Sequence, residues 1–247
     1  MYRIFVDDVN SRKEENILTL KGTDFEHLKK VLRVKVGEKI IACDKNKNDY
    51  LCEVSGIYKD FLEMNIVDII KNQSEKSYEI TLCQAMPKGN KIELVLQKAV
   101  ELGVDKIIIF YAQRCDVVYD KDKKEKKLKR YEKIIYEAAK QCNRGIIPSI
   151  EIQKNFIDLF GGFDKDNVII MAYEEEKNRT LRQALQNTKK SLCFIVGPEG
   201  GFEEKEVEYA KKSGAQIVSL GNRILRTETA GVFILSCCVY ERELGNH

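Results

Sequence analysis

The chain has 247 residues, of which 43% are hydrophobic and 33% charged, as is typical of a folded protein of one large or two modest domains. No apolar run approaches the roughly twenty residues that cross a bilayer, and the residues after Met1 lack the apolar stretch of a signal peptide, so we expect a cytoplasmic protein without a membrane span. The net charge of +3 is small, so a nucleic-acid partner would have to bind local basic patches.

The cysteine and histidine content argues against a metal site. None of the eight cysteines forms a Cys-x-x-Cys pair, and only two histidines, His27 and His247, could join them as ligands. Most of the cysteines fall in apolar segments, as buried free thiols do. We therefore expect neither a bound metal nor a disulfide framework.

The first 70 residues alternate between short apolar strands and polar turns. The predicted strands are 3–6, 17–20, 39–43, 50–57 and 61–69. This spacing is typical of a small β-barrel. A helix that Thr23 caps interrupts the strands, with four apolar side chains at helical spacing, Phe25, Leu28, Val31 and Leu32. Lys29, Lys30 and Arg33 lie on or beside its exposed face, either as solvated charges or as contacts to an anionic partner.

Beyond a polar linker at 71–77 the hydrophobic period changes. A strand at 78–85, a helix at 89–102 and a strand at 106–111 follow one another. The helix is expected to bury Ile92, Val95, Leu96, Ala99 and Val100. This order predicts parallel strands covered by helices. Lys88 follows the first strand and Arg114 the second, beside a crevice where an RNA backbone could lie.

A basic segment then opens a long helix. Residues 121–130 carry seven cations and two acids, and the helix continues to Gln141, with Gly145 as the expected C-cap. A solvated helix face is the interpretation that we favour for these cations. A strand at 150–152, a short helix at 156–160 and a strand at 168–172 continue the α/β alternation.

The richest stretch lies between residues 192 and 240. A strand at 192–196 ends in the turn 197–201, a charged helix follows at 203–212, and a second strand at 216–220 ends in the loop 221–230. Open α/β sheets bind ligands beyond the carboxyl ends of their strands, so these loops form the candidate pocket. Neither loop has the glycine pattern of a phosphate cradle. Glycine and Pro198 instead suit main-chain contacts to a flat group such as adenine.

The second loop ends in Arg226-Thr227-Glu228-Thr229, directly before the apolar run 231–240. A helix that is apolar on every side must be buried in a core or against a partner chain, where unpaired charge is costly. An N-cap by Thr227 or Thr229, with Glu228 near the positive end of the helix, is the alternative interpretation. Capping explains the Thr and Glu residues but leaves Arg226 unexplained.

The two loops, 197–201 and 220–230, together resemble the signature of the ribosomal RNA small subunit methyltransferase E family, within the SPOUT superfamily. The stretch His27 to Arg33 is similar to the family pattern His-x-x-x-Val-Leu-Arg, and the resemblance covers most of the chain. It implies a PUA-like RNA-binding β-barrel at 1–71 and, at 76–243, a SPOUT α/β domain with a deep trefoil knot. Lys140 and Asn143 depart from the family pattern Glu-Gln-Cys/Ser-Gly-Arg, and Glu203 replaces a usual Ser or Thr cap.

The resemblance also implies a set of functional residues. S-adenosylmethionine would be held by residues from three loops: Ala172, Tyr173, Glu174, Gly197, Pro198, Gly201, Leu220, Gly221, Ile224, Leu225, Arg226 and Thr227. Arg226 would stabilise charge on the target base, Glu228 would orient it or accept the proton, and Glu199 is the reserve base. RNA would contact Arg3, Lys30, Arg33, Lys88, Arg114 and Arg144.

The implied reaction is methylation of N3 of a uridine in 16S ribosomal RNA, with the free RNA or the small ribosomal subunit as partner and the apolar helix 231–240 buried in a homodimer. Two alternatives stay open. One is a non-catalytic RNA-binding or ribosome-assembly factor, and the other is a SPOUT methyltransferase that acts on a ribose 2′-OH or on transfer RNA.

Overall fold

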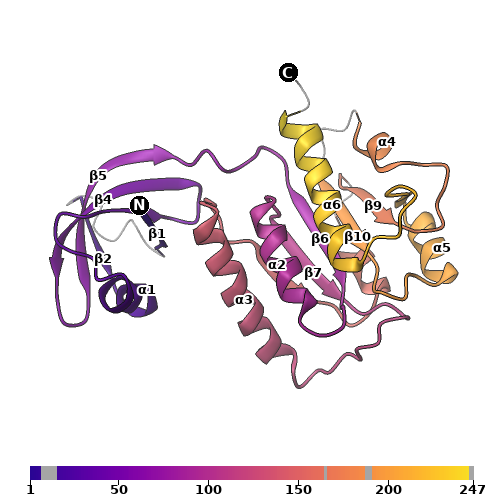
Figure 1. Cartoon of the computed structure of the whole chain (residues 1–247), viewed down its shortest axis with the longest axis horizontal. Helices are drawn as coiled ribbons and strands as arrows, with labels where there is room; N and C mark the ends of the chain where they lie inside the picture. Colours follow the sequence, from indigo (N-terminus) through magenta and orange to yellow (C-terminus); the bar gives the residue numbers. More distant parts are fainter. Residues whose placement is uncertain (7–15, 164–165, 187–190, 245–247) are drawn as a thin grey trace. The chain divides into compact units, whose positions relative to one another are not determined.

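The structure, a computed structural model, describes residues 1–6, 16–163, 166–186 and 191–244. The chain divides into two compact units. Unit 1 comprises Met1–Glu75 together with Ala139–Ile147, and unit 2 comprises Lys76–Ala138 and Pro148–His247 (Figure 1). Each unit has its own hydrophobic core.

Unit 1 is a five-stranded sheet in the order β1-β3-β4-β5-β2. Its strands are β1 (Tyr2–Phe5), β2 (Ile17–Leu20), β3 (Lys39–Cys43), β4 (Asn48–Ile57) and β5 (Leu62–Lys71). β1 and β3 are parallel and the other pairs antiparallel. Alternate apolar side chains, among them Ile40, Leu62 and Met64, pack into one core, which is the burial that period-2 patterning predicts.

The helical segment of unit 1 differs from the expected one. Helix α1 (Gly22–Glu26) begins after Lys21, so the predicted cap at Thr23 is wrong. A π-helical turn, η2 (His27–Val31), follows it directly. Its wider period turns Val31 outward, with 64% of the residue exposed, whereas Phe25 and Leu28 are buried as predicted.

The residues around the predicted linker are fixed by buried polar contacts. Arg3 donates two hydrogen bonds, of 3.0 and 2.7 Å, to the Asp49 carboxylate and a third, of 2.7 Å, to the Arg144 carbonyl. The Asn72 amide donates to the same carboxylate at 2.9 Å, and Arg144 donates to Glu75 at 2.8 Å. The side chains of Arg144 and Glu75 are each 3% exposed. Residues 72–75 are therefore part of the unit 1 fold and not a free linker.

Helix α3 (Lys124–Gln141) ends in a left-handed residue, Asn143, whose φ is 60°. The Asn143 N–H bonds to the Lys140 carbonyl and the Arg144 N–H to the Ala139 carbonyl, which is the Schellman pattern. The predicted C-cap at Gly145 is therefore wrong by two positions. Asn tolerates the left-handed region better than most residues, which explains how it replaces the glycine of the family pattern.

Unit 2 is built on a six-stranded, fully parallel sheet in the order β11-β9-β10-β6-β7-β8. The strands are β6 (Ile80–Ala85), β7 (Lys106–Phe110), β8 (Ser149–Ile152), β9 (Val168–Ala172), β10 (Leu192–Val196) and β11 (Gln216–Val218). All six were expected from the sequence, with shifts of a few residues at their ends. β11 pairs with β9 and skips β10, so the loops that follow these three strands leave neighbouring positions.

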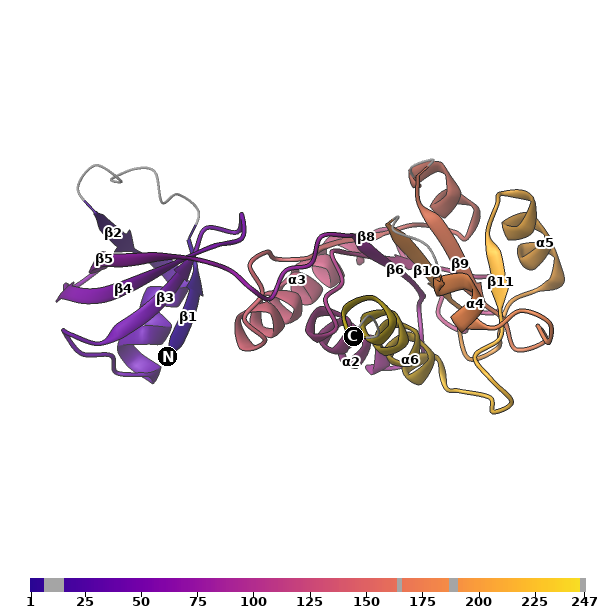
Figure 2. The ribbon, with the colours of Figure 1, turned by 90° about the horizontal axis from the view of Figure 1, so that it is seen from above.

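Helices cover both faces of this sheet. On one face, Cys83, Ile108, Met171 and Ile195 pack with an aromatic cluster from the 3-10 helix η3 (Ile157–Gly162) and with α5 (Glu204–Lys212). α2 (Lys91–Glu101), α3 and α6 (Thr227–Val239) lie on the other face (Figure 2). α2 buries the five predicted side chains. A short helix that the sequence analysis missed, α4 (Leu181–Leu185), begins at a cap in which Thr180 and Gln183 exchange hydrogen bonds.

The apolar run expected at 231–240 is most of α6, which begins at Thr227 with Arg226 at the N-cap position. Neither Thr227 nor Thr229 is the cap, so the capping interpretation of these residues is wrong. Across the described ranges, no helix is long and apolar enough to cross a membrane.

Candidate functional site

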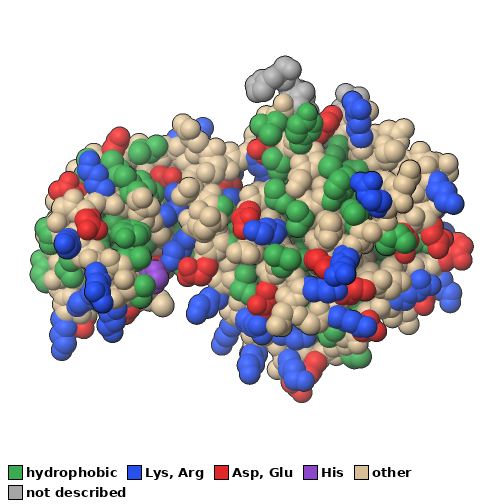
Figure 3. Space-filling view, viewed as in Figure 1, with side chains coloured by type: hydrophobic (Ala, Val, Ile, Leu, Met, Phe, Trp, Pro, Cys, Tyr) green, Lys and Arg blue, Asp and Glu red, His purple; other side chains and the backbone are tan. Residues whose placement is uncertain are grey.

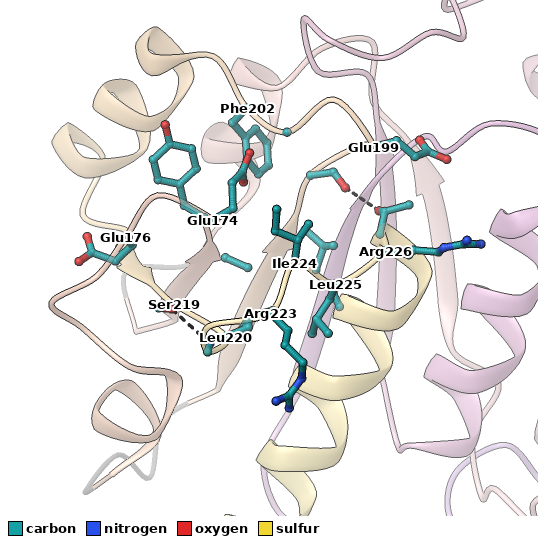
Figure 4. A pocket seen from close by; sticks show the side chains of 18 of the residues that line it. Glu174, Glu176, Glu199, Phe202, Ser219, Leu220, Arg223, Ile224, Leu225 and Arg226 are labelled. Carbon is teal, nitrogen blue, oxygen red and sulfur yellow. Dashed lines mark hydrogen bonds between the residues drawn. The ribbon is translucent and has the colours of Figure 1, made fainter.

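Three loops at the carboxyl edge of the unit 2 sheet enclose an open cavity of about 760 Å³. They follow β9 (residues 173–177), β10 (residues 197–202) and β11 (residues 219–227), and their side chains converge in Figure 4. The strand order makes β9 the neighbour of both β10 and β11, which is why loops distant in the sequence meet. The volume falls within the range of small-molecule sites.

A hydrogen bond joins two of these loops. The Thr227 hydroxyl donates to the Gly197 carbonyl at 2.6 Å and accepts from the Gln84 side-chain amide at 2.8 Å. Thr227 and Gln84 are both buried. Thr227 therefore fixes the start of α6 against the turn after β10, and this explains the threonine better than capping does.

The turn after β10 needs glycine for steric reasons. A Cβ at Gly197 would lie 2.8 Å from the Phe202 ring, and one at Gly200 would lie 3.1 Å from both the Cβ and the carbonyl of Arg114. Gly201 has φ +68°, and a Cβ there would collide with the Glu174 carboxylate. Bare backbone therefore forms this wall of the cavity and is accessible to a flat ligand.

The third loop places apolar side chains around the cavity. Ile224 is 90% exposed although it is a large aliphatic residue, and Leu225 next to it is half-buried. Figure 4 shows both beside the turn after β10, with Glu174 across the cavity. A ligand with an apolar ring would cover this surface and remove it from water.

Lys91, at the first position of α2, joins two of the predicted catalytic acids. Its Nζ lies 2.7 Å from Glu199 Oε1 and 3.7 Å from Glu228 Oε2. Glu228 Oε2 is buried and accepts no hydrogen bond within the described residues. Arg226 lies close enough to Lys91 for its positive charge to oppose the rise in the pKa of Lys91. Figure 4 shows the Arg226 side chain on the side of the cavity where Glu199 lies.

Lys91 and Glu199 shift each other's pKa. Burial alone would raise the pKa of Glu199, but the hydrogen bonds from Lys91 and from the Lys88 N–H outweigh it, so the net pKa is lowered from its usual 4.5. The hydrogen bond to Glu199 raises the pKa of Lys91. Glu199 is thus a weak proton acceptor held in its ionised form, which fits a positioning role better than that of a base.

All twelve residues predicted to hold the cofactor line this cavity. Of the three predicted catalytic residues, Arg226 and Glu199 line it, whereas Glu228 lies behind the rim against Lys91. Lys91 was not selected from the sequence. Its position directly after the loop at the end of β6, one residue before the first buried side chain of α2, is the signal that could have indicated it.

The predicted RNA contacts separate into three groups. Lys88 and Arg114 belong to unit 2 and flank the cavity: Lys88 pairs with Asp116 at 2.8 Å, and Arg114 donates to the Gly200 carbonyl at 3.3 Å. Lys30 and Arg33 are exposed in unit 1.

The structure argues against the third group, Arg3 and Arg144, as RNA contacts. Both guanidinium groups are almost fully buried and are hydrogen-bonded to Asp49 and Glu75 respectively. We do not retain either residue as a phosphate contact, because binding RNA would require breaking a buried ion pair.

Among the described residues, no group of three or more His, Cys, Asp or Glu side chains is placed to hold a metal ion. The eight cysteines are free thiols, and burial raises the pKa of Cys52 and Cys238 to about 12.

Comparison with known proteins gives this geometry a family. The sequence model of one protein family, the RNA methyltransferase domain, matches residues 74–239. That of a second family, the RNA methyltransferase PUA domain, matches residues 20–67. The ribosomal RNA small subunit methyltransferase E of Mesomycoplasma hyopneumoniae is 35% identical over 97% of this chain and 99% of its own length. The chain belongs to the ribosomal RNA small subunit methyltransferase E family. The family assignment made from the two loops is thereby confirmed.

A further relative and two cofactor-bound structures agree with this assignment in sequence and in structure. The Bacillus subtilis relative is 32% identical over 99% of this chain and 98% of its own length. The crystal structure of the Neisseria gonorrhoeae family member bound to S-adenosyl methionine superposes with a TM-score of 0.88 at 28% identity, covering 98% of each chain. A methyltransferase of Legionella pneumophila in complex with the same cofactor superposes with a TM-score of 0.85 at 29% identity, covering 97% of each chain.

Proposed function

We propose that this protein transfers a methyl group from S-adenosylmethionine to N3 of a specific uridine in 16S ribosomal RNA. The observation that carries the proposal is the cavity: three strand-end loops, two of them joined by Thr227 and Gly197, form a slot of about 760 Å³ with bare glycine backbone on one wall and exposed Ile224 on another. The cofactor-bound structures of two relatives support the choice of ligand.

The residues present fit this cofactor. Main-chain groups of 197–201 and 220–225 would hold the adenine, because Gly197, Gly200 and Gly201 leave no room for side chains and keep bare backbone on this wall. Glu174, on the loop after β9, would lie against the cofactor and accept hydrogen bonds from its polar groups. When bound, S-adenosylmethionine supplies a sulfonium-activated methyl group, which needs no metal for its transfer.

The target nitrogen sets the demands on the protein. N3 of uridine carries a proton and lies on the pairing edge, so the base must be presented unpaired and must lose that proton as the new N–C bond forms. Arg226 would donate to O2 or O4 and stabilise the developing anion. Glu228, behind the rim and with a buried Oε2 that accepts no hydrogen bond in the described chain, would orient Arg226 or accept the N3 proton. Lys91 would hold both acids in place.

The family fold also supports a knot and a dimer as parts of this proposal. The chain would pass through a loop to form a trefoil knot, which is consistent with β11 pairing beside β9 and with α6 returning to contact the turn after β10. α6 would bury its outer surface against a second copy. Phe233 (39% exposed) on α6, Tyr240 (64%) directly after it and Leu94 (47%) on α2 would be covered there. A ribosomal substrate implies a cytoplasmic site of action.

The experiment is methyl transfer from labelled S-adenosylmethionine to a 16S ribosomal RNA transcript, with calorimetry of cofactor binding alongside. Arg226 is exposed, so we expect Arg226→Ala to lower the rate constant at least 100-fold while the unfolding midpoint stays within the range of a surface substitution. Near-normal transfer by this variant removes Arg226 from the mechanism. Absence of cofactor binding by the wild type would favour a non-catalytic RNA-binding factor.

A further inference from the structure

The basic start of α3 is a feature of unit 2 that the reaction leaves unexplained. Residues 121–130 carry seven cations and two acids, a local charge of +5. The rest of the chain then has 35 cations and 37 acids, a net charge of −2. The positive charge of the whole protein therefore depends on this one segment.

The charges are arranged along one side of the helix. Lys126, Lys129, Arg130 and Lys133, which we call the α3 stripe, are all exposed and recur at intervals of three and four residues. The helix buries its opposite side through Tyr131 and Ile135. Figure 3 shows blue side chains gathered along the lower edge of the larger unit, where Figure 1 places the first turns of α3.

This arrangement opposes helix stability. The N-terminal end of a helix is the positive end of its dipole and favours acids, yet the first turn of α3 has three lysines and a single acid, Glu125. α5 has the favourable order, with Glu204 and Glu206 in its first turn and Lys211 and Lys212 in its last. A helix whose charges only had to be solvated would be more stable with acids in the first turn and lysines in the last, as in α5. The opposite order in α3 indicates that its cations bind an anionic partner.

The α3 stripe is connected to the cavity through α2. Arg130 pairs with Glu93, and Lys91, two residues earlier in α2, pairs with Glu199 on the cavity rim. Lys127 donates a 3.2 Å hydrogen bond to the Tyr111 hydroxyl, just after β7, and the loop that follows carries Arg114, which bonds to Gly200. A chain bound along the stripe is thus held by elements that also shape the rim.

We propose that the α3 stripe binds the phosphate backbone of the RNA substrate outside the cavity. The inference rests on the proposed function and adds a second RNA-binding surface in the methyltransferase unit. Lys126 and Lys133 are seven residues apart, about 10 Å along the helix, so the stripe is long enough to contact more than one phosphate of a bound strand. Lys126 and Lys129 form no ion pair within the described ranges, so both charges are available to phosphates.

The test compares two triple variants of the full-length protein with equal charge loss. Lys126→Gln/Lys129→Gln/Lys133→Gln removes the stripe charge, and Lys154→Gln/Lys205→Gln/Lys212→Gln removes three exposed lysines elsewhere in unit 2. Binding of a 16S ribosomal RNA transcript is measured by filter retention at several salt concentrations. Calorimetry with S-adenosylmethionine and thermal unfolding are measured on the same preparations.

We expect the stripe variant to lose at least tenfold in RNA affinity at low salt, and its slope of log K against log salt to become shallower by about 2 to 3. Its cofactor affinity and unfolding midpoint should not fall, because all three side chains are exposed and the charge of Lys126, in the first turn, opposes the helix dipole. A slope change equal to that of the control variant overturns the inference while leaving the proposed function intact. A wild-type protein that binds no RNA overturns both.

Discussion

The Thr227 hydroxyl donates a 2.6 Å hydrogen bond to the carbonyl of Gly197, across thirty residues of sequence. Through this bond the start of α6 is fixed against the turn after β10, and the cavity lies beside that contact. Gln84, buried in β6, donates to the same hydroxyl at 2.8 Å and ties both loops to the sheet. The shape of the proposed cofactor slot therefore depends on one side-chain oxygen.

We expect Thr227→Val to damage the slot, although valine has nearly the same shape as threonine. The substitution leaves the Gly197 carbonyl and the Gln84 amide without their partner, which should lower the free energy of unfolding by about 1–3 kcal/mol. Cofactor affinity should fall with it, as measured by calorimetry. Thr227→Ser, which keeps the hydroxyl, is the matched control and should bind nearly as the wild type does. Equal affinities for the Val and Ser variants would show that the hydroxyl is dispensable.

A second prediction concerns Gly201. Gly201→Ala places a side chain in a left-handed conformation and also drives Glu174 out of position. Gly214→Ala introduces the same backbone strain, at φ +88°, where nothing lies within 4 Å. Both variants should lose about 1–2 kcal/mol of stability, but only Gly201→Ala should weaken cofactor binding, by at least tenfold. A similar loss of binding in both variants would assign the effect to strain and not to the cavity wall.

Sequence reasoning succeeded where a local pattern determines the outcome. Strands such as 168–172 and 192–196 are continuous apolar runs, and buried parallel strands are the structure that such runs predict. The two glycine-marked loops were recognised for the same reason, since the turn chemistry lies within a few residues. The family resemblance of these loops implied the cofactor set, which also includes Ala172, Tyr173 and Glu174 from a third loop, and every member of it lines the cavity.

It failed where a residue's environment is set by partners far along the chain. Arginine is a residue type that often contacts phosphate, which is why Arg3 and Arg144 were selected. Their actual partners, Asp49 and Glu75, lie 46 and 69 residues away in the sequence. A helix cap was the alternative interpretation of Thr227, because Gly197 cannot be known as its neighbour from spacing alone. Lys91 was missed because its acid partners are contributed by another loop and by α6.

The Lys91–Glu199 pair predicts a pH effect on stability. Because the pKa of Glu199 is lowered in the folded state, its ionised form stabilises the fold above its usual pKa of 4.5, and this contribution is lost as the pH falls below that value. Glu199→Gln should therefore flatten the decline in unfolding midpoint between about pH 5 and pH 3. In Lys91→Met, the unfolding midpoint above pH 5 should depend on pH no more steeply than it does in the wild type. An unchanged profile in Glu199→Gln would mean that the pair contributes nothing to folding.

Asn143 allows a test of the helix end in unit 1. Its φ of 60° is tolerated by Asn and is free of strain for Gly, so Asn143→Gly should leave stability unchanged or raise it slightly. Asn143→Ala should lower the free energy of unfolding by about 1 kcal/mol relative to Asn143→Gly. Urea unfolding of the full-length variants measures the difference. If Ala and Gly are equivalent, the left-handed conformation at this position is not maintained in solution.

The central claim is that this chain methylates N3 of a uridine in 16S ribosomal RNA. The most direct measurement is mass spectrometry of nucleosides from the 16S ribosomal RNA and, separately, from the transfer RNA of a strain that lacks the gene, with and without complementation. We predict that 3-methyluridine disappears in the deletion strain, returns with the wild-type gene and does not return with the Arg226→Ala gene. A deletion strain that retains its 3-methyluridine, or that loses a ribose-methylated or transfer-RNA nucleoside instead, would contradict the claim.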